Sequence, residues 1–270
     1  CMRIGIIIGR IGDVDGVALE TEKWICVLER MGHEVYLLSG RFREDIIAPE
    51  RQTLFPLLSF FSPECEWEQQ RAFFFPPDNP TQLLDTLERN ANQVADQITQ
   101  WVHDNKIEAL LSQNASALPC HLSMGLGIKK AVQHLGLPVV THDHDFAWER
   151  GERYASPFPE ITQLVAQTFP LQLDGVRHAV INLNAQKDLQ TRFNMDATVV
   201  PNVMDFGKPF AQSDAYNQDL RASLGLSEDD ILLFQITRIV RRKGIEVAMD
   251  LVRRIKDPRV KLVITGSAAD

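Results

Sequence analysis

The chain has 270 residues, of which 44% are hydrophobic, 24% charged and 8% aromatic. This composition excludes a disordered chain, which would have fewer apolar residues, and a collagen-like chain, which would have far more glycine and proline. The formal net charge of −8 indicates no general attraction to nucleic acid or to anionic membranes. The apolar runs fall far short of the roughly 20 residues that a membrane span needs. Four scattered cysteines suit neither a metal site nor a disulfide framework, so we expect a cytoplasmic protein.

Strand-like and helix-like segments alternate from the N-terminus onward. The apolar run Arg3–Ile8 predicts a strand, and a glycine-containing loop follows it. From Val17 the apolar residues recur at helical spacing and predict a helix that ends near Gly32, before a strand over His33–Leu38. Strand, helix and strand in this order form a βαβ unit, which implies a parallel sheet.

The same alternation continues up to Val200 and predicts a doubly wound α/β domain over residues 1–204. The segments that carry this prediction are helices from Pro80 to Trp101, over Pro119–Leu135 and over Ala185–Phe193, with strands over Ile107–Leu111, Leu137–Thr141, His178–Leu183 and Ala197–Val200.

A second series of elements follows the turn-rich segment Asp205–Asp219. A buried strand is predicted over Ile231–Ile236, a helix over Ile245–Ile255 and a strand over Val260–Thr265. We therefore expect residues 205–270 to be the start of a second Rossmann-like domain. Because about half of such a domain would be absent, we also expect the chain to be truncated.

Two of the loops that follow predicted strands could bind a ligand, since open parallel sheets bind ligands at the carboxyl ends of their strands. Gly9–Gly16 is glycine-rich, but it matches neither the dinucleotide fingerprint nor the P-loop. It could bring the next helix N-terminus to a phosphate or be a plain βα turn. Asn114, in the segment Gln113–Ser116, could bind a polar ligand or only fill its loop.

The segment His142–Arg150 is unusually rich in ionisable side chains, with two histidines, three acids and an arginine. Such a set can hold a proton, a metal ion or the hydroxyls of a sugar. A hydrolase metal site built on His142 and His144 lacks support, because Phe146 stands where the metallo-β-lactamase-like pattern needs Asp. A purely structural polar loop stays open as an alternative.

Basic residues crowd the segment Arg238–Gly244, which precedes a predicted helix. Cations at a helix N-terminus oppose the helix dipole, and binding of an anion would offset that cost. The segment therefore predicts a site for a small anion such as a diphosphate. The alternative is a solvated basic turn.

Five segments in this order resemble glycosyltransferase family 4. Members of that family have the GT-B fold of two Rossmann-like domains and are retaining, metal-independent enzymes that use nucleotide-sugar donors. The stretches HDHDFAWERGERY and VPNVMDF further resemble the mannosylglucosylglycerate synthase-type branch, which uses GDP-mannose. The five segments are Gly16-Val17 with the helix to Met31-Gly32-His33-Glu34-Val35, Pro138–Val140 leading to His144-Asp145, Val200–Asp205, Arg238 with Lys243-Gly244, and Leu262–Gly266.

The resemblance implies roles for individual residues. Arg238 and Lys243 match the basic pair that binds the donor diphosphate and stabilises it as it leaves, which agrees with the physics of a metal-free leaving group. His144 matches the histidine that contacts the donor sugar, and we assign it with Arg238 and Lys243 to the catalytic set. Gly16 and Gly266 complete the donor-binding set. The expected acceptor-binding residues are Asn114, His142, Asp145, Glu149 and Arg150.

We therefore expect a retaining hexosyltransferase that moves a sugar from GDP-mannose or UDP-glucose to a small polar acceptor, such as a glycerate glycoside or a sugar, without a metal or other cofactor. An acidic acceptor would explain Arg150. The alternatives are a non-catalytic nucleotide- or sugar-binding module and a metal-dependent hydrolase using His142 and His144. The family's two glutamates, which contact donor sugar and ribose, would follow the last residue, so we expect little activity from these 270 residues alone.

Overall fold

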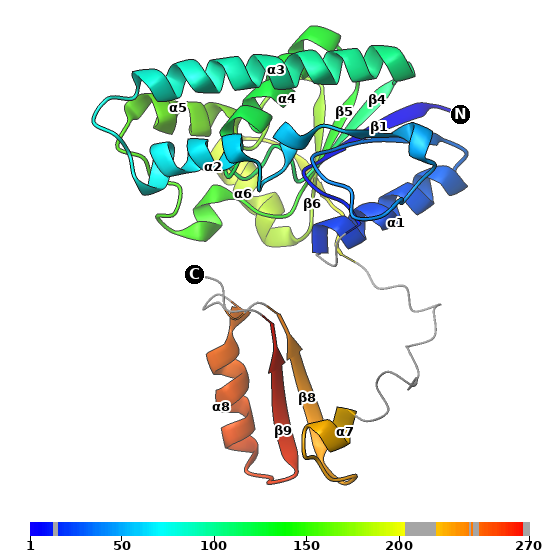
Figure 1. Cartoon of the computed structure of the whole chain (residues 1–270), viewed down its shortest axis with the longest axis vertical. Coiled ribbons are helices and arrows are strands. Elements are labelled where there is room, and N and C mark those ends of the chain that lie inside the picture. The colour runs from blue at the N-terminus through cyan, green and yellow to red at the C-terminus, as the bar shows by residue number, and fades with distance from the viewer. Residues whose placement is uncertain (13–15, 203–219, 238, 240–242, 267–270) are drawn as a thin grey trace. The chain divides into compact units, whose positions relative to one another are not determined.

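The computed structural model describes residues 1–12, 16–202, 220–237, 239 and 243–266. The chain divides into two units, Cys1–Met204 and Asp205–Asp270. Figure 1 shows an α/β unit built on a sheet, and a small unit in which the strands β8 and β9 lie beside the helix α8. Among the described residues, no helix is long and apolar enough to cross a membrane.

Unit 1 is built on a seven-stranded parallel sheet with the order β3-β2-β1-β4-β5-β6-β7. This is the strand order of a Rossmann-type doubly wound fold, and the order reverses between β1 and β4. Ligands bind at the carboxyl ends of the strands beside such a reversal. The strands are β1 (Arg3–Ile8), β2 (Glu34–Ser39), β3 (Gln52–Leu54), β4 (Ala109–Gln113), β5 (Val139–Asp143), β6 (Val176–Val180) and β7 (Ala197–Val199).

Helices cover both faces of this sheet (Figure 1). Successive strand side chains point to opposite faces, so Ile7 packs with residues of α3 and α4, whereas Ile6 and Ile8 pack with residues of α1. The helices of unit 1 are α1 (Gly16–Arg30), α2 (Pro63–Gln69), α3 (Thr81–Asn105), α4 (Leu122–Leu135), α5 (Pro159–Thr168) and α6 (Leu183–Phe193), with a π-helical turn η3 (Gln70–Phe74) after α2.

The helices α3 and α4 pack closely, and α2 ties the start of α4 in place. A Cβ atom on Gly127 would lie 2.5 Å from Cβ of Val94, so only glycine allows this approach. The buried carboxylate of Glu68 accepts hydrogen bonds from N (3.0 Å) and Oγ (2.6 Å) of Ser123, in the first turn of α4, and from Nδ2 of Asn90 (2.9 Å). Glu68 thus satisfies an N–H group at the start of α4 that has no partner within the helix.

Unit 2 contains a parallel pair of strands, β8 (Ile231–Ile236) and β9 (Val260–Thr265), with α7 (Leu220–Ser223) and α8 (Ile245–Ile255). The prediction that Ile231–Ile236 is a strand is confirmed, but the prediction that it is buried is wrong. Ile236 is 79% exposed and Ile231 is 46% exposed. An apolar strand is buried only where other elements cover it, and the described part of unit 2 leaves these side chains uncovered.

The predicted strands and long helices are present, with shifted ends. The predicted strand His178–Leu183 begins at Val176 and ends at Val180, because Asn182 caps the next helix by accepting a hydrogen bond from N of Ala185 (2.8 Å). The strand β3 and the helices α2 and α5 were not predicted from the sequence. The predicted linker Asp205–Asp219 lies outside the described residues.

Candidate active site at the carboxyl edge of the sheet

The ends of β4 and β5 bring the predicted loops of unit 1 together. Gln113 is paired in register with His142, and N of Asn114 donates to O of His142 at 2.8 Å. Oδ1 of Asn114 accepts from N of His144 at 3.0 Å and lies 3.4 Å from N of Asp145. Asn114 therefore holds the chain in position just after β5, and its left-handed backbone (φ 47°) brings its side chain to that place.

His142 and His144 form a compact network with two other side chains. Their ring centroids are 4.6 Å apart. Nδ1 of His142 lies 3.1 Å from Nε1 of Trp24 on α1 and 3.0 Å from Nε2 of Gln113. Nε2 of Gln113 also lies 3.2 Å from Nε2 of His144. Three elements, α1, β4 and β5, thus fix the two imidazole rings.

The indole of Trp24 decides where the protons in this network lie. An indole N–H can only donate, so Nδ1 of His142 accepts and its proton sits on Nε2, 3.3 Å from O of Val200. With this tautomer, the amide nitrogen of Gln113 shares the single lone pair of His142 Nδ1 with the indole N–H and directs its second hydrogen at Nε2 of His144, while Oε1 of Gln113 has no hydrogen-bond partner. His144 consequently carries its proton on Nδ1.

Both imidazoles are neutral at physiological pH. Burial lowers the pKa of His144 to about 4, with a further lowering from His142 and an opposing effect of Asp145. Burial also lowers the pKa of His142. A neutral His144 can orient a sugar hydroxyl by hydrogen bonding, but it cannot supply a positive charge.

The residues after His144 form an ion-paired loop. Nη2 of Arg150 contacts Oδ1 of Asp145 at 2.7 Å, and the Arg150 side chain is only 14% exposed. Glu149 is exposed, but partial desolvation raises the pKa of its carboxyl group, and the negative charge of Asp145 raises it further. Trp148 stacks on Phe146 with ring centroids 4.7 Å apart, which anchors the loop to the core.

A second set of polar groups lies buried on the other face of β5. Oγ1 of Thr141 bonds to Nδ1 of His178 at 2.8 Å. Asp143 is fully buried, and neither of its carboxylate oxygens has a hydrogen-bond partner. Burial raises the pKa of Asp143 to about 7, and the nearby Thr141 hydroxyl lowers it by less. Such a carboxyl group is neutral below pH 7.

The predicted donor-binding residues belong to two different sheets. Gly16 is the first residue of α1, with open space where a side chain would be. Lys243 is exposed just before Gly244, which caps the start of α8, and its carbonyl accepts from Nε2 of Gln235 at 2.8 Å. Gly266 follows β9 and has a φ of 147°. Because β8 and β9 are parallel, Gly266 lies at the same sheet edge as the end of β8. Arg238 lies outside the described residues.

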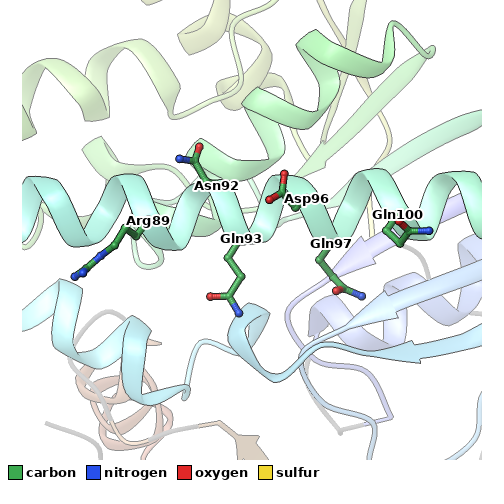
Figure 2. A pocket seen from close by; sticks show the side chains of 6 residues that line it. All are labelled: Arg89, Asn92, Gln93, Asp96, Gln97 and Gln100. Carbon is green, nitrogen blue, oxygen red and sulfur yellow. The ribbon is translucent and has the colours of Figure 1, made fainter.

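Two surface hollows occur in unit 1, and neither is lined by a predicted site residue. One lies between α1 and the segment at Asp45 and Ile46. The other lies along α3, and Figure 2 shows the polar side chains that line it: Arg89, Asn92, Gln93, Asp96, Gln97 and Gln100. These hollows have no histidine in their lining, and the chemistry of the candidate site lies elsewhere.

The metal-hydrolase alternative finds no support. Both ring nitrogens of His142 are hydrogen-bonded to protein groups. Over the described ranges, no group of three or more His, Cys, Asp or Glu side chains is arranged to hold a metal ion.

Sequence reasoning missed Trp24 and Gln113 as site residues. Trp24 lies in the helix whose apolar residues recur from Val17, and nothing local signals that its N–H reaches a histidine 118 residues away. Gln113 lies in a segment that the sequence indicates as a possible ligand-binding loop. Its contacts with His142 and His144 depend on the pairing of β4 with β5. One signal could have identified the contact of Trp24 with His142. A tryptophan on a helix that follows a strand can direct its N–H group at a histidine at the end of a neighbouring strand.

The sequence is similar to two curated proteins. It is 32% identical over 258 residues to the mannosylglucosylglycerate synthase of Thermotoga maritima, covering 95% of this chain and 57% of the relative. It is 29% identical over 272 residues to the protein of the same name from Petrotoga mobilis, covering 97% and 59%. The chain thus spans less than two thirds of the length of these relatives. No family model matches it.

Solved structures show the same fold. WaaG, a glycosyltransferase involved in lipopolysaccharide biosynthesis, superposes with a TM-score of 0.57 at 12% identity, over 97% of this chain and 62% of its own. The sucrose-phosphate synthase of Thermosynechococcus elongatus gives a TM-score of 0.55 at 14% identity, over 98% and 62%. By sequence, the chain is similar to proteins named mannosylglucosylglycerate synthase, and its fold is that of solved glycosyltransferases, with the α/β architecture of the GT-B type.

Proposed function

We propose that the protein is a retaining glycosyltransferase that moves a mannosyl group from GDP-mannose to glucosylglycerate. The observation that carries this proposal is the 32% identity, over 95% of the chain, to a relative named mannosylglucosylglycerate synthase. The neutral, buried histidine pair at the carboxyl edge of the unit 1 sheet supports it, because it offers hydrogen bonds to sugar hydroxyls without requiring a metal.

In this proposal, unit 1 handles the sugar and the acceptor. His144 donates its Nδ1–H to an oxygen of the donor sugar, and Trp24 and Gln113 keep the proton on that nitrogen. His144 is then a residue that orients the sugar, since a pKa of about 4 leaves it without charge at neutral pH. The acceptor lies against the loop that contains Asp145 and Arg150.

Unit 2 binds the donor diphosphate. Lys243 lies before the N-terminus of α8, where backbone N–H groups and a cation favour an anion. Gly266 lets the backbone come close to the phosphates, and Arg238 supplies a second cation. The acceptor hydroxyl oxygen bonds to the anomeric carbon on the face that the diphosphate leaves. The bond from that carbon to the diphosphate oxygen breaks, and a phosphate oxygen takes the hydroxyl proton.

We also propose that the reaction needs no metal and takes place in the cytoplasm. The fixed cations and helix N–H groups can stabilise the leaving diphosphate in place of a metal. All four cysteines are free thiols, which fits a reducing compartment.

The test is a transfer assay with the protein as its gene encodes it. GDP-mannose and UDP-glucose are each offered with glucosylglycerate, in the presence of EDTA or of Mg²⁺, and the product is identified by mass spectrometry. We expect mannosyl transfer from GDP-mannose at the same rate under both conditions. Absence of product from either donor, or loss of activity in EDTA, would contradict the proposal.

A further inference from the structure

The arginine that the sequence suggested for an acidic acceptor is already paired. Arg150 contacts Asp145 at 2.7 Å and is largely buried. The carboxylate of Asp145 offsets the positive charge of Arg150, so Arg150 attracts a ligand carboxylate less strongly than an arginine without an ion pair. A second cation close to this loop would therefore favour a negatively charged acceptor.

Arg153 lies three residues after Arg150, and its side chain has different surroundings. It is exposed, and over the described residues no carboxylate lies within ion-pair distance of its guanidinium. Its Cζ atom lies 5.1 Å from the ring centre of Phe74 and 5.9 Å from that of Tyr154. The side chain of Arg153 also donates a hydrogen bond to the Tyr154 hydroxyl oxygen. Aromatic rings attract a guanidinium without using its N–H groups, so the remaining N–H groups stay available for a carboxylate.

The aromatic support of Arg153 is itself fixed. Phe74 ends the π-helical turn η3, a kind of turn that often occurs at functional sites. Phe73 meets Tyr154 edge-to-face, with ring centroids 5.3 Å apart, in a cluster that includes the buried Phe158. The rings thus hold the guanidinium in place before a ligand arrives, which lowers the entropic cost of binding.

Arg153 also belongs to the same loop cluster as the candidate site. Its backbone N donates to O of Arg150 at 3.3 Å, and Arg150 is paired with Asp145, the residue after His144. Cys120 lies within reach of all three charges: burial raises its pKa to about 12, Asp145 adds to the rise, and Arg150 and Arg153 oppose it.

We propose that Arg153 binds the carboxylate of the acceptor, through its guanidinium fork, and so selects an acidic glycoside over an uncharged one. This inference rests on the proposed function and adds a residue for the acceptor. Arg150 instead orients the loop through Asp145. The bidentate contact that a guanidinium makes with a carboxylate supplies the selectivity.

The test compares two acceptors that differ only in charge, glucosylglycerate and glucosylglycerol. Their dissociation constants are measured by titration calorimetry with the protein at low salt. Hydrogen bonds to a charged group lead us to expect that the wild-type protein binds glucosylglycerate roughly tenfold to a hundredfold more tightly. Arg153→Ala should remove this preference, Arg153→Lys should keep part of it, and binding of glucosylglycerol should not change.

The matched control is Arg177→Ala, which removes an exposed arginine from the opposite, amino-terminal end of β6. It should leave the preference intact. An Arg153→Ala protein that is folded by circular dichroism and still prefers glucosylglycerate would overturn the inference and leave the proposed function standing, as would a wild-type protein that transfers mannose equally to both acceptors. If the protein binds neither acceptor and transfers no mannose, both the inference and the proposed function are wrong.

Discussion

The two candidate ligand-binding edges of this protein hold their polar groups in different ways. In unit 1, His142, His144 and Asn114 are nearly inaccessible to solvent and are hydrogen-bonded to neighbouring elements. In unit 2, Lys243 and Gly266 are exposed. The first edge is part of the folded core, whereas the second presents its groups to solvent.

Because of this difference, substitutions at the two edges should affect folding stability and ligand binding to different extents. A buried polar group that loses its partner costs about 1–3 kcal/mol of folding free energy, so changes at the unit 1 edge should alter both folding and the site. Exposed residues without such partners usually change stability by less than about 0.5 kcal/mol, so changes at the unit 2 edge should alter ligand binding alone.

The largest effect is expected from Asp143, whose buried carboxyl has no hydrogen-bond partner. Burial raises its pKa from the ordinary value of 3.8 to about 7. Because the folded state holds the proton more tightly, this group stabilises the fold fully below pH 4, and the stabilisation is lost as the pH rises to 7, by about 1.4 kcal/mol per pH unit. The total is roughly 4 kcal/mol.

The Asp143→Asn variant should lack this dependence. Urea unfolding at a series of pH values gives the difference in unfolding free energy between variant and wild type, in which the other titrating groups cancel. We expect the variant to become more stable relative to the wild type as the pH rises from 4 to 7. Above pH 7 the difference in unfolding free energy should stay constant. A difference that does not change with pH would show that Asp143 titrates normally in the folded state.

The second prediction concerns Glu68, which ties α2 to α4. Glu68→Ala leaves the donors of Ser123 and Asn90 without their buried acceptor, so we expect a loss of about 3 kcal/mol in unfolding free energy. Glu66→Ala is the control, because Glu66 is exposed on the same helix. Denaturant unfolding measures both variants, and equal losses would mean that the hydrogen bonds of Glu68 contribute nothing.

Much of the unit 1 fold follows from its sequence, because its elements are long or strongly periodic. The helix α3 places Leu83, Leu87, Ala91, Val94 and Ile98 on one buried face, as their spacing predicts. Short elements such as β3 and α2 carry too few residues for a period to be visible. The exposure of Ile236 could not be predicted either, since an apolar strand shows no sign of whether other elements cover it.

The chemistry of the site was predictable only in part. The sequence indicates which strand-end loops carry polar residues, since strand ends follow from the pattern. It does not indicate which groups those residues contact by hydrogen bonds or ion pairs. The ion pair of Arg150, an expected acceptor-binding residue, with Asp145 was not predicted, because Asp145 lies five positions earlier in a loop without regular periodicity. That pairing, like the contact of Trp24 with His142, depends on tertiary geometry.

The third prediction tests the proton positions at the unit 1 edge. Trp24→Phe keeps an aromatic ring next to His142 but removes the N–H that makes Nδ1 an acceptor. We expect a loss of about 1 kcal/mol in stability. In the wild type, ring-nitrogen NMR should show the proton of His142 on Nε2 and that of His144 on Nδ1, and in the variant this preference should weaken.

Trp101→Phe is the control for the third prediction, since the buried Nε1 of Trp101 has no hydrogen-bond partner. It makes the same change of ring size without removing a hydrogen bond, so both histidines should keep their protons. A wild-type spectrum with the proton of His142 on Nδ1 would contradict the assignment.

The smallest effect on folding is expected at Lys243, on the exposed edge of unit 2. Lys243→Ala should change the unfolding free energy by less than about 0.5 kcal/mol, because Lys243 is exposed and its carbonyl, which Gln235 binds, is retained. The same variant should bind GDP roughly tenfold more weakly, since hydrogen bonds to a charged phosphate contribute about 1.5 kcal/mol or more. Lys261→Ala, at the amino-terminal end of β9, removes an equal charge from the opposite end of the strand and should leave GDP binding unchanged. Titration calorimetry with GDP separates the two variants. Equal affinities in all three proteins would mean that the anion binds elsewhere, whereas a large loss of stability in Lys243→Ala would remove the distinction between a core-bound edge and a solvent-facing one.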